Sequence, residues 1–274
     1  MLDLAIVGSG PAALSAAIYA VRAGLKVQVF EKDNIGGTLP EIAYIENYPG
    51  FIGAGTELAE KFRSQATKLG AEISYGECTS VGTGWLTIDG EKVEARAILL
   101  ATGSAPRKLN IEGITAPVSY CAVCDGVLYK GKRVAVVGGG KSAVQESAHL
   151  AKFAREVVIF SRSAIKADQS AIEKLGANVE VKENVEVDAE ILNQFDGVFV
   201  FIGKTPATDF LPADLLNENG FIKTTDYQTA LPGVFAAGDV RLGATQQIVA
   251  AAADGAAAAT RIAEFLKENP IAYE

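Results

Sequence analysis

Near the start of the chain stand the residues Leu4-Ala5-Ile6-Val7-Gly8-Ser9-Gly10-Pro11-Ala12-Ala13, an apolar strand followed by a GxGxxA turn. The first glycine allows a tight turn, the second lets the backbone approach a pyrophosphate, and the last small residue lets a helix pack on the strand. The pyrophosphate then lies at the helix N-terminus, where unpaired amides and the helix dipole favour an anion. The stretch therefore predicts a dinucleotide-binding unit.

The same plan recurs 130 residues later, in Val134-Ala135-Val136-Val137-Gly138-Gly139-Gly140-Lys141-Ser142-Ala143. In both copies a predicted helix (residues 12–23 and 142–153) and a second apolar strand (residues 27–30 and 157–160) follow the turn. One glycine-rich turn is weak evidence, whereas two copies in full strand-turn-helix-strand context are strong. We expect an α/β protein with two Rossmann-like, three-layer dinucleotide-binding domains.

The composition narrows the class of protein. The chain has 274 residues, of which 49% are hydrophobic and 21% charged, and its net charge of -8 argues against nucleic acid as a main partner. No run approaches the roughly 18 apolar residues that would span a bilayer, and residues 2–7 form a predicted strand rather than a signal peptide. With only three cysteines, a structural disulfide framework is not expected, and a reducing cytoplasm is the predicted location.

The residues Cys121-Ala122-Val123-Cys124-Asp125-Gly126 place two thiols three positions apart beside an acid. Such a pair can close a small disulfide ring or hold one thiolate ready to attack another disulfide, and the neighbouring carboxyl group can move the proton. The alternative is half of a zinc site. Zinc requires four ligands, and the chain offers only His149 and Cys78 besides the pair, so no metal is predicted.

The two copies of the turn differ where specificity for the nucleotide is decided. In the first copy Glu31 follows the second strand, where a carboxylate accepts hydrogen bonds from a ribose diol. The same count from Gly138 reaches Ser161, followed by Arg162, so a ribose 2'-phosphate is tolerable there. The alternative for Arg162 is an exposed cation at a strand end. The first site suits an adenosine with free hydroxyls, and the second leans to NADP.

Each half closes with a similar strand and glycine turn. Residues 97–103 and 198–203 both end in glycine ahead of a proline, and we interpret these turns as crossovers between domains. A third strand, residues 233–237, ends in Gly238-Asp239 and leads to an alanine-rich helix over residues 245–267. Asp239 either binds a cofactor hydroxyl or caps a helix.

These motifs together resemble the low-molecular-weight thioredoxin reductases over nearly the whole chain. Besides the two glycine turns and the cysteine motif, the matching stretches are Glu46-Asn47-Tyr48-Pro49-Gly50-Phe51, Ala101-Thr102-Gly103 and Pro232-Gly233-Val234-Phe235-Ala236-Ala237-Gly238-Asp239-Val240. The resemblance implies an FAD domain built from residues 1–111 and 205–274. A shortened domain of the NAD(P)H type, residues 112–204, is inserted into it and carries the cysteines.

The resemblance also implies the binding residues. Those expected to hold FAD are Gly8, Gly10, Pro11, Ala12, Ala13, Glu31, Gly36, Gly37, Asn47, Ala101, Thr102, Gly103, Gly238, Asp239, Gln246, Gln247 and Ile248. Those expected to hold NADPH are Gly138, Gly140, Ser142, Ala143, Arg162 and Lys166.

By the same resemblance, reduced flavin passes two electrons to the Cys121/Cys124 disulfide, with Cys124 nearer the flavin and Asp125 as general acid and base. Cys121 then attacks the disulfide of thioredoxin or a thioredoxin-like protein. The family implies a homodimer whose inserted domain rotates about hinges near residues 110–118 and 203–206.

Departures from the family pattern leave the electron donor open. The run Ser161-Arg162-Ser163-Ala164-Ile165-Lys166 replaces a His-Arg-Arg stretch, the inserted domain passes from Lys166 to Phe199 through one predicted strand pair, and Gln246 replaces an arginine. NADPH is the preferred donor, with NADH or reduced ferredoxin as alternatives. Two other classes remain, a flavin-dependent dithiol oxidase and a non-enzymatic redox-responsive binding protein.

Overall fold

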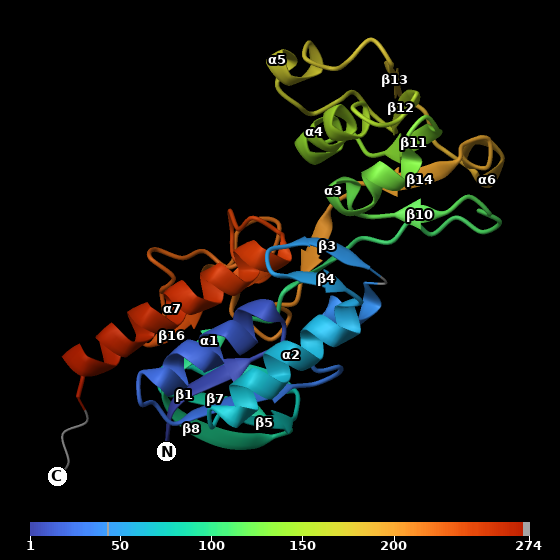
Figure 1. Cartoon of the computed structure of the whole chain (residues 1–274). Helices are drawn as coiled ribbons and strands as arrows, with labels where there is room; N and C mark the ends of the chain where they lie inside the picture. The colour runs from blue at the N-terminus through green and yellow to red at the C-terminus, as the bar shows by residue number, and fades with distance from the viewer. Residues whose placement is uncertain (43, 271–274) are drawn as a thin grey trace. The chain divides into compact units, whose positions relative to one another are not determined.

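The computed structural model describes residues 1–42 and 44–270, which separate into two compact units (Figure 1). The first unit is Met1–Ala105 with Thr205–Glu274, and the inserted unit is Pro106–Lys204. The family resemblance implies a first domain boundary at residues 111/112, whereas the structure divides the chain at 105/106, close to the glycine turn at Gly103 that we interpret as a crossover. In the structure the amide of Arg107 donates to the carbonyl of Gly203 at 3.0 Å, which ties residues just after 105 into the inserted unit.

The first unit is built on a seven-stranded sheet in the order β5-β2-β1-β8-β7-β6, with β16 paired to β8. Strands β5, β2, β1, β8 and β16 are parallel, and β8-β7-β6 is an antiparallel extension. The strand bounds are β1 Leu2–Val7, β2 Val27–Glu31, β5 Glu72–Tyr75, β6 Cys78–Gly82, β7 Trp85–Ile88, β8 Glu91–Leu100 and β16 Val234–Ala236. Because the central strands are parallel, their carboxyl ends meet at one edge, where ligands bind in such sheets.

Three helices and several short elements surround this sheet. The helices are α1 Pro11–Arg22, α2 Gly55–Lys68 and α7 Ile248–Glu268, and the short elements are η1 Leu39–Glu41, β3 Ile45–Tyr48, β4 Phe51–Gly53, η3 Ala213–Leu215 and η4 Gly238–Val240. Two crossing segments, β9 Ser104–Pro106 and β15 Lys204–Pro206, pair with each other. Among the helices of the described ranges, none combines the length and the hydropathy needed to cross a bilayer.

Helices α1 and α7 pack closely because their contact is made of small residues. Ala12, Ala13 and Ala16 on α1 and Ala258 on α7 are buried in one core with Leu4 and Ile6 of β1. A β-carbon at Gly255 would collide with the main-chain carbonyl of Ala12. The alanine-rich sequence of α7 therefore sets the distance between the two helices.

The inserted unit holds a five-stranded parallel sheet in the order β10-β14-β11-β12-β13. Its strands are β10 Val118–Ser119, β11 Arg133–Val137, β12 Glu156–Ser161, β13 Val179–Glu183 and β14 Gly197–Val200. Its helices are α3 Ala122–Asp125, η2 Gly126–Tyr129, α4 Lys141–Leu150, α5 Gln169–Ile172 and α6 Ala189–Leu192. Apolar clusters cover both faces of the sheet. The predicted fold class, with two Rossmann-like domains, is confirmed.

Three details differ from the predictions made from the sequence. Helix α7 begins at Ile248 rather than at residue 245. The two strands predicted between Lys166 and Phe199 correspond to β13 and β14, which are not neighbours, since β11 and β12 lie between them. Helix α4 ends at Leu150 rather than at residue 153, and the side-chain amide of Asn178 donates to the carbonyls of Ala151 and Ala154 at 3.0 Å each. These bonds satisfy carbonyls just beyond the helix end.

Gly255→Ala tests the packing of α1 against α7. In an open helix, replacing glycine by alanine stabilises by up to about 1 kcal/mol. At Gly255 the added methyl group must push α1 away, so we expect a net loss of about 1–3 kcal/mol in the free energy of unfolding.

Urea denaturation of the two variants Gly255→Ala and Ala253→Gly measures this effect. Ala253 is exposed on the same helix, so Ala253→Gly should lower the free energy of unfolding by about 1 kcal/mol, the difference in helix propensity between alanine and glycine. A stabilised Gly255→Ala protein would show that the close approach of the two helices is not required.

Candidate active site

The first glycine turn lies at the carboxyl end of β1 and leaves room for a ligand at the start of α1. Gly8 has φ +98°, and a β-carbon there would lie 2.5 Å from the carbonyl oxygen of Ala101. Gly10, the N-cap of α1, has no atom within 4 Å of such a β-carbon. Pro11 takes the first helical position, where its missing amide is not needed. Open space before the amides of Ala12 and Ala13 fits a pyrophosphate.

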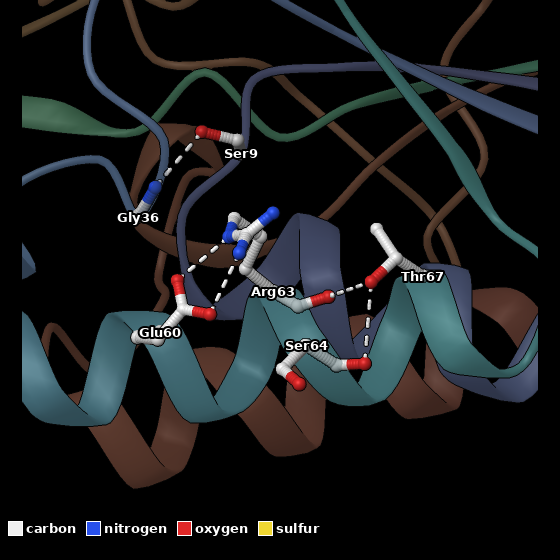
Figure 2. Close-up of polar contacts among 6 residues, drawn as sticks. All are labelled: Ser9, Gly36, Glu60, Arg63, Ser64 and Thr67. Atoms are coloured by element: carbon white, nitrogen blue, oxygen red, sulfur yellow. Dashed lines mark hydrogen bonds and ion pairs between the residues drawn. The ribbon is translucent and has the colours of Figure 1, made fainter.

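The buried carboxylate of Glu31 stands beside this turn at the end of β2. It is 9% exposed, and it accepts a hydrogen bond of 2.6 Å from the hydroxyl of Ser9 and one of 2.9 Å from the amide of Asp33. The amide of Gly36 donates to the Ser9 hydroxyl oxygen at 3.1 Å, as Figure 2 shows. Ser9 therefore joins the turn to both Glu31 and the Gly36-Gly37 loop. The sequence reading missed this role, because Ser9 occupies a variable position of the motif.

The neighbouring strand ends complete this edge. Ala101 follows β8, and its amide donates to the carbonyl of Val7 at 2.9 Å. The Thr102 hydroxyl donates to the carbonyl of Ala207 at 2.7 Å, and Gly103 has φ +73°. Because β1 and β8 are parallel neighbours, these residues and Gly8 lie at the same edge of the sheet.

Gly238 and Asp239 lie at the end of β16, in the short helix η4. The predicted alternative for Asp239, a helix cap, does not describe it, because the N-cap of η4 is Ala237 and that of α7 is Gln247. The amide of Gly238 donates to Asp254 at 2.8 Å, and Asp254 also binds Arg241 through two bonds of 2.7 and 3.0 Å.

This ion pair, which the sequence reading missed, lines a cavity of about 160 Å³. The remaining lining residues are Gly238, Gly243, Ala244, Thr245, Ala250 and Ala251. The carboxylate of Asp254 holds the pKa of the Arg241 guanidinium above its ordinary value, mainly by hydrogen bonding. The contacts of Asp254 with Arg241 and with the amide of Gly238 thus join the loop after β16 to α7.

The hairpin β3-β4 and the start of α7 are joined by side-chain amides. Asn47 donates to Gln247 at 3.3 Å, and Gln246 donates to Ser104 at 3.3 Å. Ile248, the first residue of α7, packs on the apolar cluster under the hairpin. Gly37 approaches the backbone of Gly10, since its β-carbon would lie 3.1 Å from that Cα atom. Hydrogen bonds and close backbone contacts thus connect the segments that carry the residues expected to hold FAD. The open space at Gly10, the buried carboxylate of Glu31 and the positive φ of Gly8 fit that cofactor.

In the inserted unit, Cys121 and Cys124 form a disulfide across helix α3, with Cα atoms 5.3 Å apart. Cys121 is the N-cap of α3, and the amide of Cys124 donates to its Sγ atom at 3.2 Å. An amide aimed at a sulfur stabilises negative charge on it. Both sulfur-bearing residues are half-buried, so a partner can reach the pair.

Asp125 lies at the end of α3 and is held by a residue that the sequence did not single out. Ser119 donates from its hydroxyl to Oδ2 of Asp125 at 2.6 Å, and the same hydroxyl oxygen accepts the amide of Cys121 at 3.2 Å. Burial raises the pKa of Tyr129, and the nearby charge of Asp125 adds to this rise. The cysteines and Asp125 are thus brought together as predicted, with Ser119 and Tyr129 beside them.

The second glycine turn keeps its backbone geometry. Gly138 has φ +150°, and a β-carbon there would collide with the carbonyl of Phe201. A β-carbon at Gly140, the N-cap of α4, would meet no atom within 4 Å. Ser142 is exposed at the start of α4, whereas Ala143 is fully buried under it. Space for a phosphate group therefore remains at this helix start.

The loop after β12 folds back onto this turn. The amide of Lys166 donates to the carbonyl of Gly139 at 2.6 Å, and the ammonium of Lys141 lies 3.5 Å from Asp168. The side chains of Arg162 and Lys166 are exposed and form no ion pair within the described ranges. They are available to an anion, although Asp168 lowers the positive charge at the helix start.

A disulfide between cysteines three positions apart, in a chain with two Rossmann-like units, is typical of one class of enzyme, the flavin-dependent disulfide reductases. Comparison with family models agrees, and the chain belongs to the pyridine nucleotide-disulphide oxidoreductase family, whose model matches residues 2–255. The FAD-dependent oxidoreductase activity on a sulfur group that the sequence predicts is confirmed by this family and by named relatives.

A relative from Listeria innocua, named thioredoxin reductase, is 37% identical over 306 aligned positions that cover 99% of this chain and 96% of the relative. These positions outnumber the 274 residues of the chain, so the relative carries residues that this chain lacks. The thioredoxin reductase of Giardia duodenalis superposes with a TM-score of 0.88 at 29% identity, covering 97% of this chain and 99% of its own. That of Streptococcus pyogenes gives 0.86 at 31%, covering 98% and 99%.

The third cysteine, Cys78, should not react with alkylating agents in the folded protein. Burial raises the pKa of its thiol to about 11, so roughly one molecule in a thousand carries the thiolate at pH 8. After reduction of the protein, iodoacetamide should label Cys121 and Cys124 but leave Cys78 unlabelled, as measured by peptide mass spectrometry. If Cys78 were labelled in the native protein as fast as Cys121 and Cys124, its burial would be contradicted. Labelling of Cys78 only after denaturation would agree with it.

Proposed function

We propose that this chain is a thioredoxin reductase, in which the first unit, residues 1–105 and 205–274, holds FAD and the inserted unit, residues 106–204, carries the disulfide that reduces the partner. The observation that carries the proposal is the Cys121–Cys124 disulfide with Asp125 beside it. Relatives at 36–37% identity over nearly the whole chain bear the same name. FAD, when bound, supplies a two-electron carrier between the donor and the disulfide.

The two cysteines have different roles in this proposal. The amide of Cys124 donates to Sγ of Cys121, which favours a thiolate on Cys121 and makes it the atom that attacks the partner. Cys124 is the sulfur that receives electrons from the flavin and later resolves the mixed disulfide. Asp125 moves the proton between sulfurs.

Apolar side chains next to the cysteines support a protein partner rather than a small disulfide. Val123 and Val127 are each 43% exposed, and Leu128 is 67% exposed. A protein that docks over the disulfide would bury them, and removing apolar surface from water stabilises such a contact. A thioredoxin-like protein with an accessible disulfide is the partner that fits.

NADPH is the donor that we propose. The open space at Gly140, the exposed Arg162 and Lys166, and the absence of an acid at Ser161 support a nucleotide with a 2'-phosphate. A single exposed arginine is a weaker clamp than a cluster, so the preference for NADPH over NADH should be small. The hinges near residues 110–118 and 203–206, the homodimer and the cytoplasmic location remain predictions from the family resemblance.

Single replacements of the cysteines separate these roles. Cys124→Ser should abolish thioredoxin reduction, keep FAD bound, and accumulate a mixed disulfide between Cys121 and thioredoxin, because the resolving sulfur is missing. Cys121→Ser should also be inactive but form no such adduct. Non-reducing electrophoresis and mass spectrometry identify the adduct, and Cys78→Ala is the control that should retain activity. If the adduct formed with Cys121→Ser and not with Cys124→Ser, Cys124 would be the attacking sulfur and Cys121 the resolving one.

Flavin bleaching under anaerobic conditions identifies the donor. NADPH should bleach the flavin, NADH should do so more weakly, and Arg162→Ala should weaken NADPH roughly tenfold without changing NADH, because it removes a charge-assisted contact to the 2'-phosphate. Lys174→Ala is the control, since Lys174 is an exposed cation on the same unit. Bleaching by reduced ferredoxin but by neither nucleotide would overturn the NADPH assignment. Reoxidation by air without thioredoxin reduction would instead indicate a dithiol oxidase.

A further inference from the structure

The hydroxyl group of Ser119 lies between the two functional parts of the cysteine turn. It is only 6% exposed, it donates its one proton to Oδ2 of Asp125 at 2.6 Å, and its oxygen accepts the amide of Cys121 at 3.2 Å. The carbonyl of Cys121 is a second candidate acceptor, but at 3.4 Å it is much farther away. A hydroxyl bound to a carboxylate at 2.6 Å makes a strong, charge-assisted bond.

The position of this hydroxyl is set by the sheet rather than by the cysteine helix. Ser119 is the last residue of β10 and pairs with Phe199 of β14, whose side chain is fully buried. Helix α3, by contrast, has only four residues and little stability of its own. The bond from Ser119 thus attaches Asp125 to the rigid part of the unit.

The second oxygen of Asp125 is left available. Oδ2 is occupied by Ser119, whereas Oδ1 accepts no hydrogen bond from any residue in the described part of the chain. A carboxylate with one oxygen held and one oxygen available keeps a fixed direction while it exchanges a proton. This arrangement suits a general acid and base, which must stay within hydrogen-bond reach of its sulfur.

We propose that Ser119 is a positioning residue for the thiol–disulfide exchange, fixing the carboxylate of Asp125 so that Oδ1 serves the cysteine pair. The inference rests on the function proposed above for Asp125. In the exchange, the Cys121 thiolate attacks a partner sulfur, one mixed S–S bond forms and the partner's S–S bond breaks. Cys124 then attacks Cys121, which restores the Cys121–Cys124 disulfide and releases the second partner sulfur.

Two electrons pass to the partner in this sequence, and one proton has to move. Asp125 accepts the proton of the Cys124 thiol at Oδ1 and delivers it to one partner sulfur. The other partner sulfur leaves as a thiolate, which balances the thiolate on Cys121 at the start. Ser119 takes no part in the proton transfer and acts only through the position of Asp125.

A double-mutant cycle tests the proposal, using Ser119→Ala, Asp125→Asn and the double variant with a bacterial thioredoxin as substrate. General acid–base catalysis contributes roughly 10²–10⁴-fold, and a misplaced carboxylate should lose a part of this, about tenfold in kcat with KM unchanged. In the Asp125→Asn background, Ser119→Ala should cause no further loss. Additive losses would show that Ser119 acts independently of Asp125, which overturns the inference.

A second substrate separates positioning from a general structural defect. The aromatic disulfide 5,5'-dithiobis(2-nitrobenzoate) releases a weakly basic thiolate that needs no proton to depart. Ser119→Ala should therefore slow thioredoxin reduction more than reduction of this reagent, whereas a distorted active site would slow both alike. Ser119→Thr keeps the hydroxyl group and should therefore reduce thioredoxin faster than Ser119→Ala does.

Controls distinguish the remaining outcomes. Ser147→Ala removes a fully buried hydroxyl that has no hydrogen-bond partner in the same unit, and it should leave kcat unchanged. If Ser119→Ala does not fold, Asp125→Glu provides the test, because it keeps the acid but moves it by one methylene. Full activity of Asp125→Glu would overturn the need for positioning. Full activity of Asp125→Asn would instead refute the proposed role of Asp125 itself.

Discussion

The close approach of each glycine turn to the end of the neighbouring parallel strand is the constraint on which both units depend. Gly8 lies against the carbonyl of Ala101 after β8, and Gly138 lies against the carbonyl of Phe201 after β14. Any side chain at either glycine would separate the turn from the sheet. Because the turn stays close, the following helix starts at the carboxyl edge with open space at Gly10 or Gly140.

The two units differ in which residues meet between the glycine turn and the end of the next strand. In the first unit the turn contributes the hydroxyl of Ser9, and the strand end contributes the carboxylate of Glu31. In the inserted unit the turn residue is Gly139, and the strand end contributes the hydroxyl of Ser161, which leaves no room for a side chain at Gly139. Replacing the Ser9–Glu31 pair by Gly139 and Ser161 keeps a hydroxyl between turn and strand but removes the carboxylate. This difference supports the proposals that the first unit binds a ribose diol and that the second accepts a 2'-phosphate.

Repeated local signals made the fold predictable from the sequence. The glycine turns, the apolar strands and the cysteine spacing each depend on a few adjacent residues, so the two Rossmann-like units and the placement of Cys121, Cys124 and Asp125 could be expected. Contacts between distant residues carried no such signal. The Arg241–Asp254 pair and the Ser119–Asp125 bond each join side chains whose partners are chosen by the fold, and an ordinary serine or arginine looks the same whether or not it has such a partner.

The Ser119–Asp125 bond also bears on how a short element can hold catalytic groups. Helix α3 is a single turn with little helical stability of its own, and besides the packing of Ala122 in the core it has the hydrogen bond from Ser119 to Asp125. Attachment to β10 through one buried hydroxyl fixes the acid while leaving the sulfurs half-exposed. In the proposed mechanism the acid needs a constant direction and the cysteine pair needs freedom to change between disulfide and dithiol, and a hydrogen bond to Asp125 rather than to either sulfur satisfies both requirements.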